Sequence, residues 1–351
     1  MSFSKSAIVF AAAVWVSIAL ARPASSQTSF YHGKTITIIQ GREPGGTGDM
    51  RDRAVLPFLR KYIPGQPSIV TEFMPGGGGR KAANHIYQTA RPDGLTVGNV
   101  GSGLVAAGAL GAPGVQYDVY KFIYLGSPNS GGQWVFVTRR EAGSDSLEKL
   151  RAASGLRIGA QSVGHNIYIT GRLFAHLLDL KAPRFVTGYS GPEVDLALAR
   201  GEVDARSQVA DTIFQRAREW IEKELVHFHA ILEVPRGRQH ARFKHLPEVE
   251  NFARSEKERK LLALFRATRL AGSAFFLPPG TPEERVRVLA QAMRQAFLDP
   301  LFEKEYEKLV GEKPTPLMPE ELAQAIRDLP REPEIVELFN KIAGADPLPG
   351  R

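Results

Sequence analysis

The stretch TITIIQGREPGGTGD, residues 35–49, decides the fold. Its first five residues are all β-branched and predict a strand over 35–39. The glycine-rich turn Pro44–Asp49 follows, and it opens a helix expected over 50–62 with its apolar residues on one side. A strand that passes through such a turn into a helix is the first part of an α/β unit.

The same unit recurs along the chain. A second strand over 68–71 leads into the turn Pro75–Gly79 and a helix expected over 81–90. A third strand over 95–98 ends at Gly101-Ser102-Gly103. The order strand, helix, strand, helix, strand is half of a doubly wound sheet.

The pattern then restarts, with strands expected over 156–159, 184–186 and 203–205 and helices between them. No low-complexity linker separates the two halves, which indicates that strands cross between them and that one domain is discontinuous. The prediction is therefore an α/β protein with two lobes, each a doubly wound sheet with flanking helices. Lobe I is expected over 28–135 with 275–351, and lobe II over 136–274.

The three glycine-rich turns of the first half predict a binding site for an anion. All three follow strands and would lie at the carboxyl edge of one sheet, where ligands bind in open α/β sheets. Backbone N–H groups at helix starts carry partial positive charge, and glycine lets a ligand approach the backbone closely. The alternative is that each glycine only satisfies the geometry of a tight turn.

Known nucleotide-binding motifs do not match these turns. Gly46-x-Gly48 is followed by Arg51 where a dinucleotide fingerprint needs its third glycine, and no G-x-x-x-x-G-K-[ST] occurs. The sequence therefore disfavours a nucleotide enzyme and predicts no cofactor.

Composition limits the function further. The 351 residues include no cysteine, which excludes disulfides, thiolate metal sites and thiol nucleophiles. The 45 Lys+Arg and 37 Asp+Glu residues give a net charge of +8, which is compatible with nucleic acid, an anionic membrane or a small anionic ligand. Ten Lys+Arg against four Asp+Glu between Arg236 and Arg269 supply +6 of this surplus (10 − 4 = 6). We expect this stretch to lie on peripheral helices away from the ligand, as a solvated face or a docking surface.

The N-terminus has the pattern of a secretory signal peptide. Lys5 precedes an apolar run over 7–20, which is closed by Ala19-Leu20-Ala21 and is shorter than the roughly 20 residues of a membrane span. We expect a signal peptide over 1–21, with Ser26 as the alternative end. The mature chain is then expected to be a soluble periplasmic protein, and nucleic acid is not an expected partner.

Several of these segments, in this order, resemble the Bug (TctC-like) family, the extracytoplasmic solute receptors of tripartite tricarboxylate transporters. The matching segments extend from about residue 30 to 345: Pro44-Gly45-Gly46-x-x-Asp49, Pro75–Gly79, Arg91-Pro92-Asp93-Gly94-Leu95-Thr96, Gly188-Tyr189-Ser190-Gly191, Gly201-Glu202-Val203-Asp204 and Pro279-Gly280-Thr281-Pro282. The resemblance implies a two-lobed receptor of the periplasmic-binding-protein (Venus-flytrap) type. Such a receptor closes by a hinge on a small organic carboxylate and delivers it to a membrane permease, and a monomer is expected.

The resemblance also implies which loops contact the ligand. The expected residues are Gly45, Gly46, Thr47 and Asp49 in the first loop, Gly77 and Gly78 in the second, and Ser162, His165, Asn166, Tyr189 and Gly191 in the facing lobe. The family usually has apolar or aromatic residues where this chain has Arg42-Glu43. Arg42 could clamp a second carboxylate, whereas Glu43 could neutralise it or recognise an amine.

Three further side chains are candidates with open alternatives. Asp49 could accept a hydrogen bond from the ligand or cap its own helix. Ser102 lies in the third turn and could donate to the ligand. Asp204 is expected to end a strand and project toward the cleft, or else to make a structural hydrogen bond.

An exported serine hydrolase is the alternative function. Ser190 would be its nucleophile, with His165 and Asp204 as partners. However, Pro192 stands where a G-x-S-x-G motif needs its second glycine, and the chain order of the three residues differs from that of hydrolases. The sequence therefore favours a receptor over an enzyme.

Overall fold

The computed structural model describes residues 29–351. The predicted signal peptide, with either end, lies outside the described residues. No helix within 29–351 combines the length and the apolar character that a membrane crossing requires.

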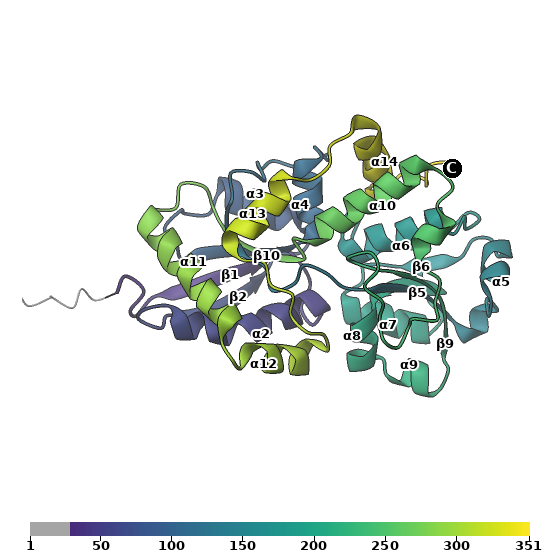
Figure 1. Ribbon diagram of the computed structural model, residues 1–351, viewed down its shortest axis with the longest axis horizontal. Coiled ribbons are helices and arrows are strands. Elements are labelled where there is room, and N and C mark those ends of the chain that lie inside the picture. Colours follow the sequence, from purple (N-terminus) through teal and green to yellow (C-terminus); the bar gives the residue numbers. More distant parts are fainter. Residues whose placement is uncertain (1–28) are drawn as a thin grey trace, which may run out of the picture.

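The first lobe is built on a mixed five-stranded sheet with strand order β2-β1-β3-β10-β4 (Figure 1). Its strands are β1 (Thr35–Gln40), β2 (Ser68–Phe73), β3 (Thr96–Gly101), β4 (Ile123–Gly126) and β10 (Ser273–Leu277). β1 pairs in parallel with β2 and β3, whereas β10 runs antiparallel to both of its neighbours. The carboxyl ends of β1, β2 and β3 therefore lie at one edge of the sheet, as the sequence predicted.

Helices cover both faces of this sheet, and β1 shows why. Ile36 and Ile38 are buried on the face that packs against Val55 and Leu59, while Ile39 is buried on the other face. A strand buried on both faces is apolar at nearly every position, as in other parallel sheets. The helices of this lobe are α2 (Thr47–Tyr62), α3 (Arg80–Gln88), α4 (Ser102–Ala109), α11 (Glu283–Leu298), α12 (Phe302–Val310) and α13 (Pro319–Arg327), with the 3₁₀ turn η1 (Gly77–Gly79).

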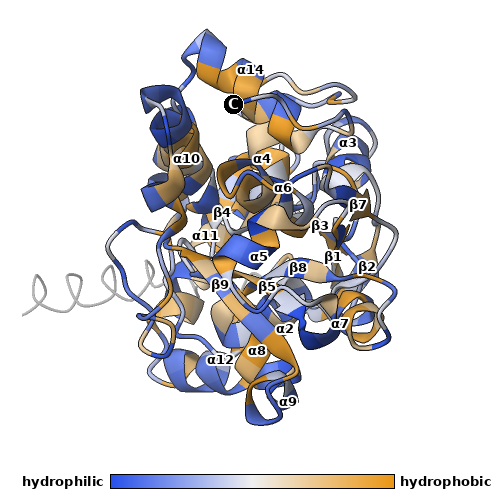
Figure 2. Ribbon diagram, turned by 90° about the vertical axis from the view of Figure 1, so that its right-hand side faces the viewer, coloured by the Kyte–Doolittle hydropathy of each residue, from blue (hydrophilic) through white to orange (hydrophobic). Residues whose placement is uncertain are grey.

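The second lobe has the same design, with strand order β7-β6-β8-β5-β9. Its strands are β5 (Trp134–Arg139), β6 (Arg157–Gly159), β7 (Arg184–Val186), β8 (Ala205–Val209) and β9 (Val226–Leu232). Its helices are α5 (Leu147–Ala152), α6 (Asn166–Leu177), α7 (Gly191–Ala199), α8 (Ala210–Arg216), α9 (Glu219–Glu222), α10 (Glu256–Arg269) and α14 (Pro333–Ala343), with the 3₁₀ turns η2 (Arg140–Ala142) and η3 (Val249–Phe252). In Figure 2, α10 and α12 alternate between hydrophilic and hydrophobic turns, as expected of helices that bury only one face.

Two segments that cross between the lobes lie side by side. The chain crosses between β4 and β5 and returns between α10 and β10. Gly272 N–H donates to the carbonyl oxygen of Asn129 at 3.1 Å, and Ser273 N–H donates to Oγ of Ser127 at 3.2 Å. These hydrogen-bonded segments are the natural hinge between the two lobes.

The lobe boundaries expected from the sequence remain a prediction. The packing of the C-terminal helix α14 is relevant to one of them. Residues 275–351 were expected in lobe I, but α14 packs against α6 and α10, and its apolar side chains belong to the core of the second lobe. Ile335, Leu338 and Phe339 are buried there. A helical pattern alone does not reveal which sheet a terminal helix will cover.

Candidate functional site

A pocket lies between the two lobes at the carboxyl edge of the first sheet. It is lined from the first lobe by the turn after β1 and the start of α4, and from the second lobe by the turns after β6 and β8. Its volume is about 60 Å³, which corresponds to roughly two water-sized groups at about 30 Å³ each. We call this space the interlobe pocket; Thr47, Gln161, Asn166, Gln208 and Gly191 are among its uncharged lining residues.

The first glycine turn touches the second lobe directly. Gly46 and Thr47 line the interlobe pocket, and Oγ1 of Thr47 lies 3.0 Å from Oγ1 of Thr212 across the cleft. The carbonyl oxygen of Gly45 accepts a hydrogen bond from Nη1 of Arg216 at 3.2 Å. The turn therefore makes one wall of the cleft and also helps to hold the lobes together.

Asp49 serves its own loop. It is 1 % exposed and accepts hydrogen bonds from the N–H of Gly45 at 2.8 Å and from Nε2 of Gln40 at 3.2 Å. It also pairs with Arg53 at 2.9 Å and does not line the interlobe pocket. Of the two roles considered for Asp49, these contacts match the structural one.

The second glycine turn packs against the turn after β6. Gly78 N–H donates to Oγ of Ser162 at 3.1 Å, and a Cβ placed on Gly78 would lie 2.5 Å from the carbonyl carbon of Gly164. Gly77 and Gly78 contribute to the contact between lobes and not to the lining of the interlobe pocket. Glycine is needed at Gly78 both for this approach and for its φ of 66°.

The third turn forms a polar cluster that joins the lobes. Oδ1 of Asn166, from the second lobe, accepts from Gly103 N–H at 2.7 Å and lies 3.1 Å from Oγ of Ser102. Ser102 is 1 % exposed and also accepts from Nη1 of Arg269 at 2.6 Å. Asn166 therefore lines the pocket, whereas Ser102 does not line it and contacts Arg269.

His165 lies at the boundary of the pocket as a neutral side chain. Burial, together with the charges of Arg42 and Arg269, lowers its pKa to about 3. Nδ1 of His165 accepts from the N–H of Ile167 at 3.2 Å. A neutral imidazole with an accepting Nδ1 carries its proton on Nε2, so His165 can offer a hydrogen-bond donor.

Four arginines line the interlobe pocket, namely Arg42, Arg51, Arg216 and Arg269. Two of these cations are neutralised by the protein. Arg51 pairs with the buried Glu312, and Arg216 pairs with Asp195 at 3.0 Å. Buried charges normally require such partners.

Arg42 lines the interlobe pocket and is held by contacts within its own lobe. Its Nη2 donates to Oδ1 of Asn99, and its guanidinium lies beneath Gly48 in the first turn of α2. Burial lowers the pKa of Arg42, and the field of Asp52 raises it again. Burial likewise raises the pKa of Asp52 to about 8, against the field of Arg42.

Arg269, like Arg42, lines the pocket and forms no ion pair with a carboxylate within residues 29–351. It is 1 % exposed, and its guanidinium lies 4.9 Å from the ring centre of Trp134. Burial and the charge of Arg51 lower its pKa to about 9, against the field of Glu312. Arg269 ends the basic stretch 236–269, which the sequence analysis placed away from the ligand, so that expectation is wrong for this residue.

In the described part of the chain, the buried side-chain atoms of the pocket residues that lack a hydrogen-bond partner are all donors. Nε1 of Trp134, Nε of Arg216 and Nε of Arg269 are buried and have no hydrogen-bond partner within residues 29–351. All three belong to residues that line the interlobe pocket. Because unpaired buried donors are costly, the pocket fits a group that only accepts hydrogen bonds, such as a carboxylate.

An adjoining space continues the cleft toward solvent. We call it the outer chamber; it has a volume of about 170 Å³, and its lining includes Gly76, Ser162, Gly188 and Tyr189. Its lining shares Arg42, Glu43, Gln161 and His165 with the interlobe pocket. Tyr189 and Ser162 thus meet the cleft here, outside the donor-rich interlobe pocket.

The structure does not bring Asp204 to the cleft. The predicted strand over 203–205 is β8 over Ala205–Val209, so Asp204 precedes the strand and lies at the opposite edge of the sheet. Its carboxylate accepts from Nε of Arg157 at 2.8 Å and from Nε of Arg139 at 3.3 Å. Asp204 is therefore part of an ion-pair cluster, the structural alternative of the sequence analysis.

Ser190 does not have the surroundings of a nucleophile. Its Oγ accepts from Glu193 N–H at 3.4 Å, and the Glu193 side chain returns a bond to the Ser190 backbone, which forms a capping box on α7. Nδ1 of His165 is occupied by the backbone of its own helix. The predicted alternative triad of Ser190, His165 and Asp204 is not assembled.

Sequence reasoning missed Trp134, Gln208, Arg216 and Arg269 as lining residues. None of them lies in a glycine turn, and all four come from the second lobe. Trp134 directly follows a segment that crosses between the lobes, and this position was the only sequence feature that could have pointed to the pocket. It does not indicate a ligand by itself.

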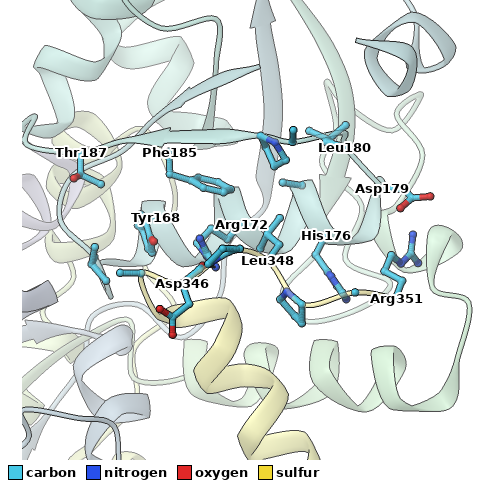
Figure 3. Close-up of a pocket in the computed structure, with 18 residues that line it drawn as sticks. Tyr168, Arg172, His176, Asp179, Leu180, Phe185, Thr187, Asp346, Leu348 and Arg351 are labelled. Carbon is cyan, nitrogen blue, oxygen red and sulfur yellow. Dashed lines mark hydrogen bonds between the residues drawn. The ribbon is translucent and has the colours of Figure 1, made fainter. Parts of the chain in front are cut away.

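A larger cavity of about 610 Å³ lies elsewhere, between α6 and the C-terminal segment (Figure 3). Tyr168, Arg172 and His176 reach into it from α6, opposite Asp346 and Leu348. Arg172 donates to the carbonyl oxygens of Ile342 and Asp346, so these donors already have acceptors. The cavity therefore has volume but no converging unpaired groups.

Within residues 29–351, no group of three or more His, Asp or Glu side chains is placed to hold a metal ion.

Comparison with known proteins identifies solved structures with a similar fold. No protein-family model and no curated protein matches the chain. Among solved structures, the periplasmic binding protein BugD is similar with a TM-score of 0.69 and 18% identity, over 90% of this chain and 99% of BugD. MatC from Rhodopseudomonas palustris, solved with bound malate, has a TM-score of 0.65 and 22% identity, over 88% of this chain and 99% of MatC. A second R. palustris protein, solved with adipate, has a TM-score of 0.64 and 19% identity, over 88% and 97% of the two chains. The chain thus has the two-lobed fold of periplasmic binding proteins.

Proposed function

We propose that this chain is an exported solute receptor of the Bug (TctC-like) family that binds a small organic carboxylate between its lobes and delivers it to a membrane permease. The observation that carries the proposal is that Trp134, Arg216 and Arg269, each with a buried donor that lacks an acceptor within residues 29–351, line one pocket. A carboxylate would supply acceptors to these donors and a counter-charge to Arg269.

The fold supports this function. Proteins of the same fold have been solved with malate and with adipate, and both are carboxylates. The contacts of Gly78 with Ser162 and of Asn166 with Gly103 join the lobes around the pocket. A ligand that contacts both lobes would favour the closed arrangement over an open one.

The direct test is a thermal-shift screen of the mature chain against mono-, di- and tricarboxylates, each paired with its uncharged amide. A ligand that binds only the folded state raises the melting temperature with its concentration, by about 2.7 kcal/mol of stability at 100 times Kd. We expect at least one acid to raise the melting temperature while its amide does not. If amides act as well as acids, or only an unrelated class of compound acts, the carboxylate proposal is wrong.

Closure can be tested separately with Gly78→Ala. The new Cβ would meet the backbone of Gly164 at 2.5 Å in the closed arrangement, so we expect ligand affinity to fall at least tenfold. Gly143→Ala is the matched control, because Gly143 has a similar φ of 71° but no atom within 4 Å of the new Cβ. Equal affinity of the two variants, measured by calorimetry, would contradict closure at this contact.

A further inference from the structure

Another cavity lies in the second lobe, where α8, α9 and β9 meet the segment 242–245. The helices α8 and α9 lie on the side of this lobe opposite α14 (Figures 1 and 2). The aromatic part of the lining defines what we call the aromatic groove: Phe214, Trp220, Phe228 and Phe243. Its volume is about 480 Å³, which corresponds to about 16 water-sized groups of about 30 Å³ each. The groove therefore has room for more than one side chain.

Contacts within the lobe fix the shape of the aromatic groove. The ring centre of Phe243 lies 4.8 Å from that of Phe228 and 5.6 Å from that of Phe214. His240 stacks on Phe214 with 3° between the ring planes, and its Nε2 lies 3.1 Å from Oδ1 of Asp211 on α8. The segment that borders the groove is thus in place before a partner arrives, which lowers the entropic cost of binding.

The aromatic side chains of the groove are recessed. Trp220 and Phe243 are buried, and Phe214 and Phe228 are half-buried. None of the large apolar side chains that are strongly exposed within residues 29–351 lines this groove. Insertion into a bilayer requires apolar side chains that protrude, whereas a recessed aromatic surface accepts side chains from a partner protein.

The border of the groove carries two cations that the protein does not neutralise, Arg242 and Lys244. Both are exposed, and neither forms an ion pair within residues 29–351. The guanidinium of Arg242 lies 4.2 Å from the ring centre of Phe214. Lys244 stands in the chain between Phe243 and His245, which both line the groove.

The acids that line the groove already have partners. Asp145 pairs with Lys149 at 2.6 Å, and Glu224 pairs with Arg140 at 3.5 Å. The charge that remains for a partner is therefore positive, and it is complementary to an acidic surface.

Two occupants from this protein itself lack that complementarity. Residues 1–28, which lie outside the described part, contain Lys5 and Arg22 and no Asp or Glu. A symmetric contact between two copies of the chain would place Arg242 and Lys244 opposite the same cations, which is unfavourable.

We propose that the aromatic groove is a docking surface for an acidic segment of another protein that carries apolar side chains between its acids. The apolar side chains enter the groove, and the acids pair with Arg242 and Lys244. In such contacts the buried apolar anchors supply most of the affinity, and the exposed charges govern the rate of association and its dependence on salt. Docking at this surface goes beyond the proposed carboxylate binding and does not depend on it.

Calorimetry of the mature chain with three blocked peptides, EEFLEE, QQFLQQ and EEGGEE, tests the docking surface. We expect EEFLEE to bind at least tenfold more tightly than either of the others, because QQFLQQ lacks the charge and EEGGEE lacks the apolar side chains. Added salt should weaken the binding of EEFLEE, because exposed ion pairs are screened. Equal binding of the three peptides, or a Kd for EEFLEE above about 1 mM, would contradict the proposal.

Charge reversal locates the site of binding. Arg242→Glu combined with Lys244→Glu should weaken the binding of EEFLEE at least tenfold. The matched control combines Lys304→Glu and Lys308→Glu on α12, two exposed lysines without an ion-pair partner within residues 29–351. This control changes the net charge equally, and its affinity for EEFLEE should stay within about twofold of wild type. Unchanged melting temperatures show that both double variants fold.

The carboxylate screen separates this proposal from the receptor function, since both double variants should keep the wild-type thermal shift with the carboxylate that binds best. Wild-type affinity for EEFLEE after charge reversal at Arg242 and Lys244 would mean that the peptide binds elsewhere. If EEFLEE does not bind and phosphatidylglycerol vesicles bind only when both cations are present, the surface contacts a membrane instead. A wild-type dimer in analytical ultracentrifugation that charge reversal abolishes would make a second copy the occupant. Each of these three results overturns the docking proposal.

Discussion

Two cavities of this protein contain nearly the same side chains and differ in what those side chains contact. In the larger one, Arg172 is 2 % exposed and stacks on Phe185 at 4.8 Å. In the smaller one, Arg269 is 1 % exposed and stacks on Trp134 at 4.9 Å. Each cavity also has a histidine, His176 in the larger and His165 in the smaller.

The difference lies in the hydrogen bonds. Arg172 donates from Nε to the carbonyl of Ile342 at 2.7 Å, and from Nη2 to the carbonyls of Lys341 and Asp346 at 3.2 and 2.6 Å. Arg269 has one partner, Ser102, and an unpaired Nε. An arginine whose donors all have backbone acceptors stabilises the fold, whereas an arginine with an unpaired donor can bind a ligand. The proposed site is therefore chosen by its unpaired donors and not by cavity volume.

The largest expected effect is that of Arg269→Met on binding. Removing one member of a buried hydrogen-bonded charge pair costs about 4 kcal/mol, or roughly 1,000-fold in Kd. The free protein should be as stable as wild type or more so, because an unpaired buried cation is lost. Calorimetry with the carboxylate that binds best in the screen gives Kd, and urea unfolding gives the free energy of unfolding. Wild-type affinity in this variant would remove Arg269 from the site.

Arg172→Met should lower stability and leave ligand affinity unchanged, the opposite of Arg269→Met. The change leaves the carbonyls of Lys341, Ile342 and Asp346 without their donor, and we expect a loss of about 3 kcal/mol in the free energy of unfolding. Ligand affinity, measured below the melting temperature, should stay within about twofold of wild type. A large loss of affinity at full stability would move the binding site to the larger cavity.

The third effect concerns pH and the two histidines. In the unfolded chain His165 takes up a proton below about pH 6.5, whereas in the folded protein its lowered pKa of about 3 keeps it neutral. The unfolded state therefore binds more protons, and stability falls as pH falls from 6.5 toward 3, by about 2 kcal/mol at pH 5. His165→Asn keeps a residue that can cap α6 and should remove this loss between pH 7 and pH 5.

His176→Asn is the matched variant in the larger cavity. Burial lowers the pKa of His176, but the field of Glu258 opposes the shift. Urea unfolding gives the loss of unfolding free energy between pH 7 and pH 5. This loss should therefore differ less from wild type in His176→Asn than in His165→Asn. The reverse order would mean that His165 is not held neutral by burial and its arginine neighbours.

Much of the first lobe could be predicted because its signals are local. The β-branched run at 35–39 and the glycines at 44–49 and 75–79 specify strands and turns through their own backbone preferences, and three turns that follow parallel strands must meet at one edge. The strand expected over 203–205 was displaced by two residues, since Val203 and Ala205 are equally apolar. That displacement moved Asp204 from the cleft to the far edge of the sheet.

The candidate site was only partly predictable. Gly46, Thr47, His165, Asn166 and Gly191, which the family resemblance assigned to ligand contact, line the interlobe pocket, and their contact with a ligand stays a prediction. Asp49 has the residue type of a ligand contact, but its partners Gly45 and Gln40 are set by how its own loop closes. Sequence reasoning could weigh these uses of Asp49 but could not choose between them.

The sequence by itself determined an α/β chain with two halves and glycine-rich turns at the ends of its first strands, because periodicity and backbone freedom are properties of neighbouring residues. Only the tertiary structure decided that Trp134 and Arg269, which are 135 positions apart (269 − 134 = 135), stack beside the hinge and leave donors in the cleft. The fold brings them together through two crossing segments that pair with each other at Asn129 and Gly272. Whether a buried arginine is satisfied depends on such distant partners, and for that reason its role could not be read from its place in a basic stretch.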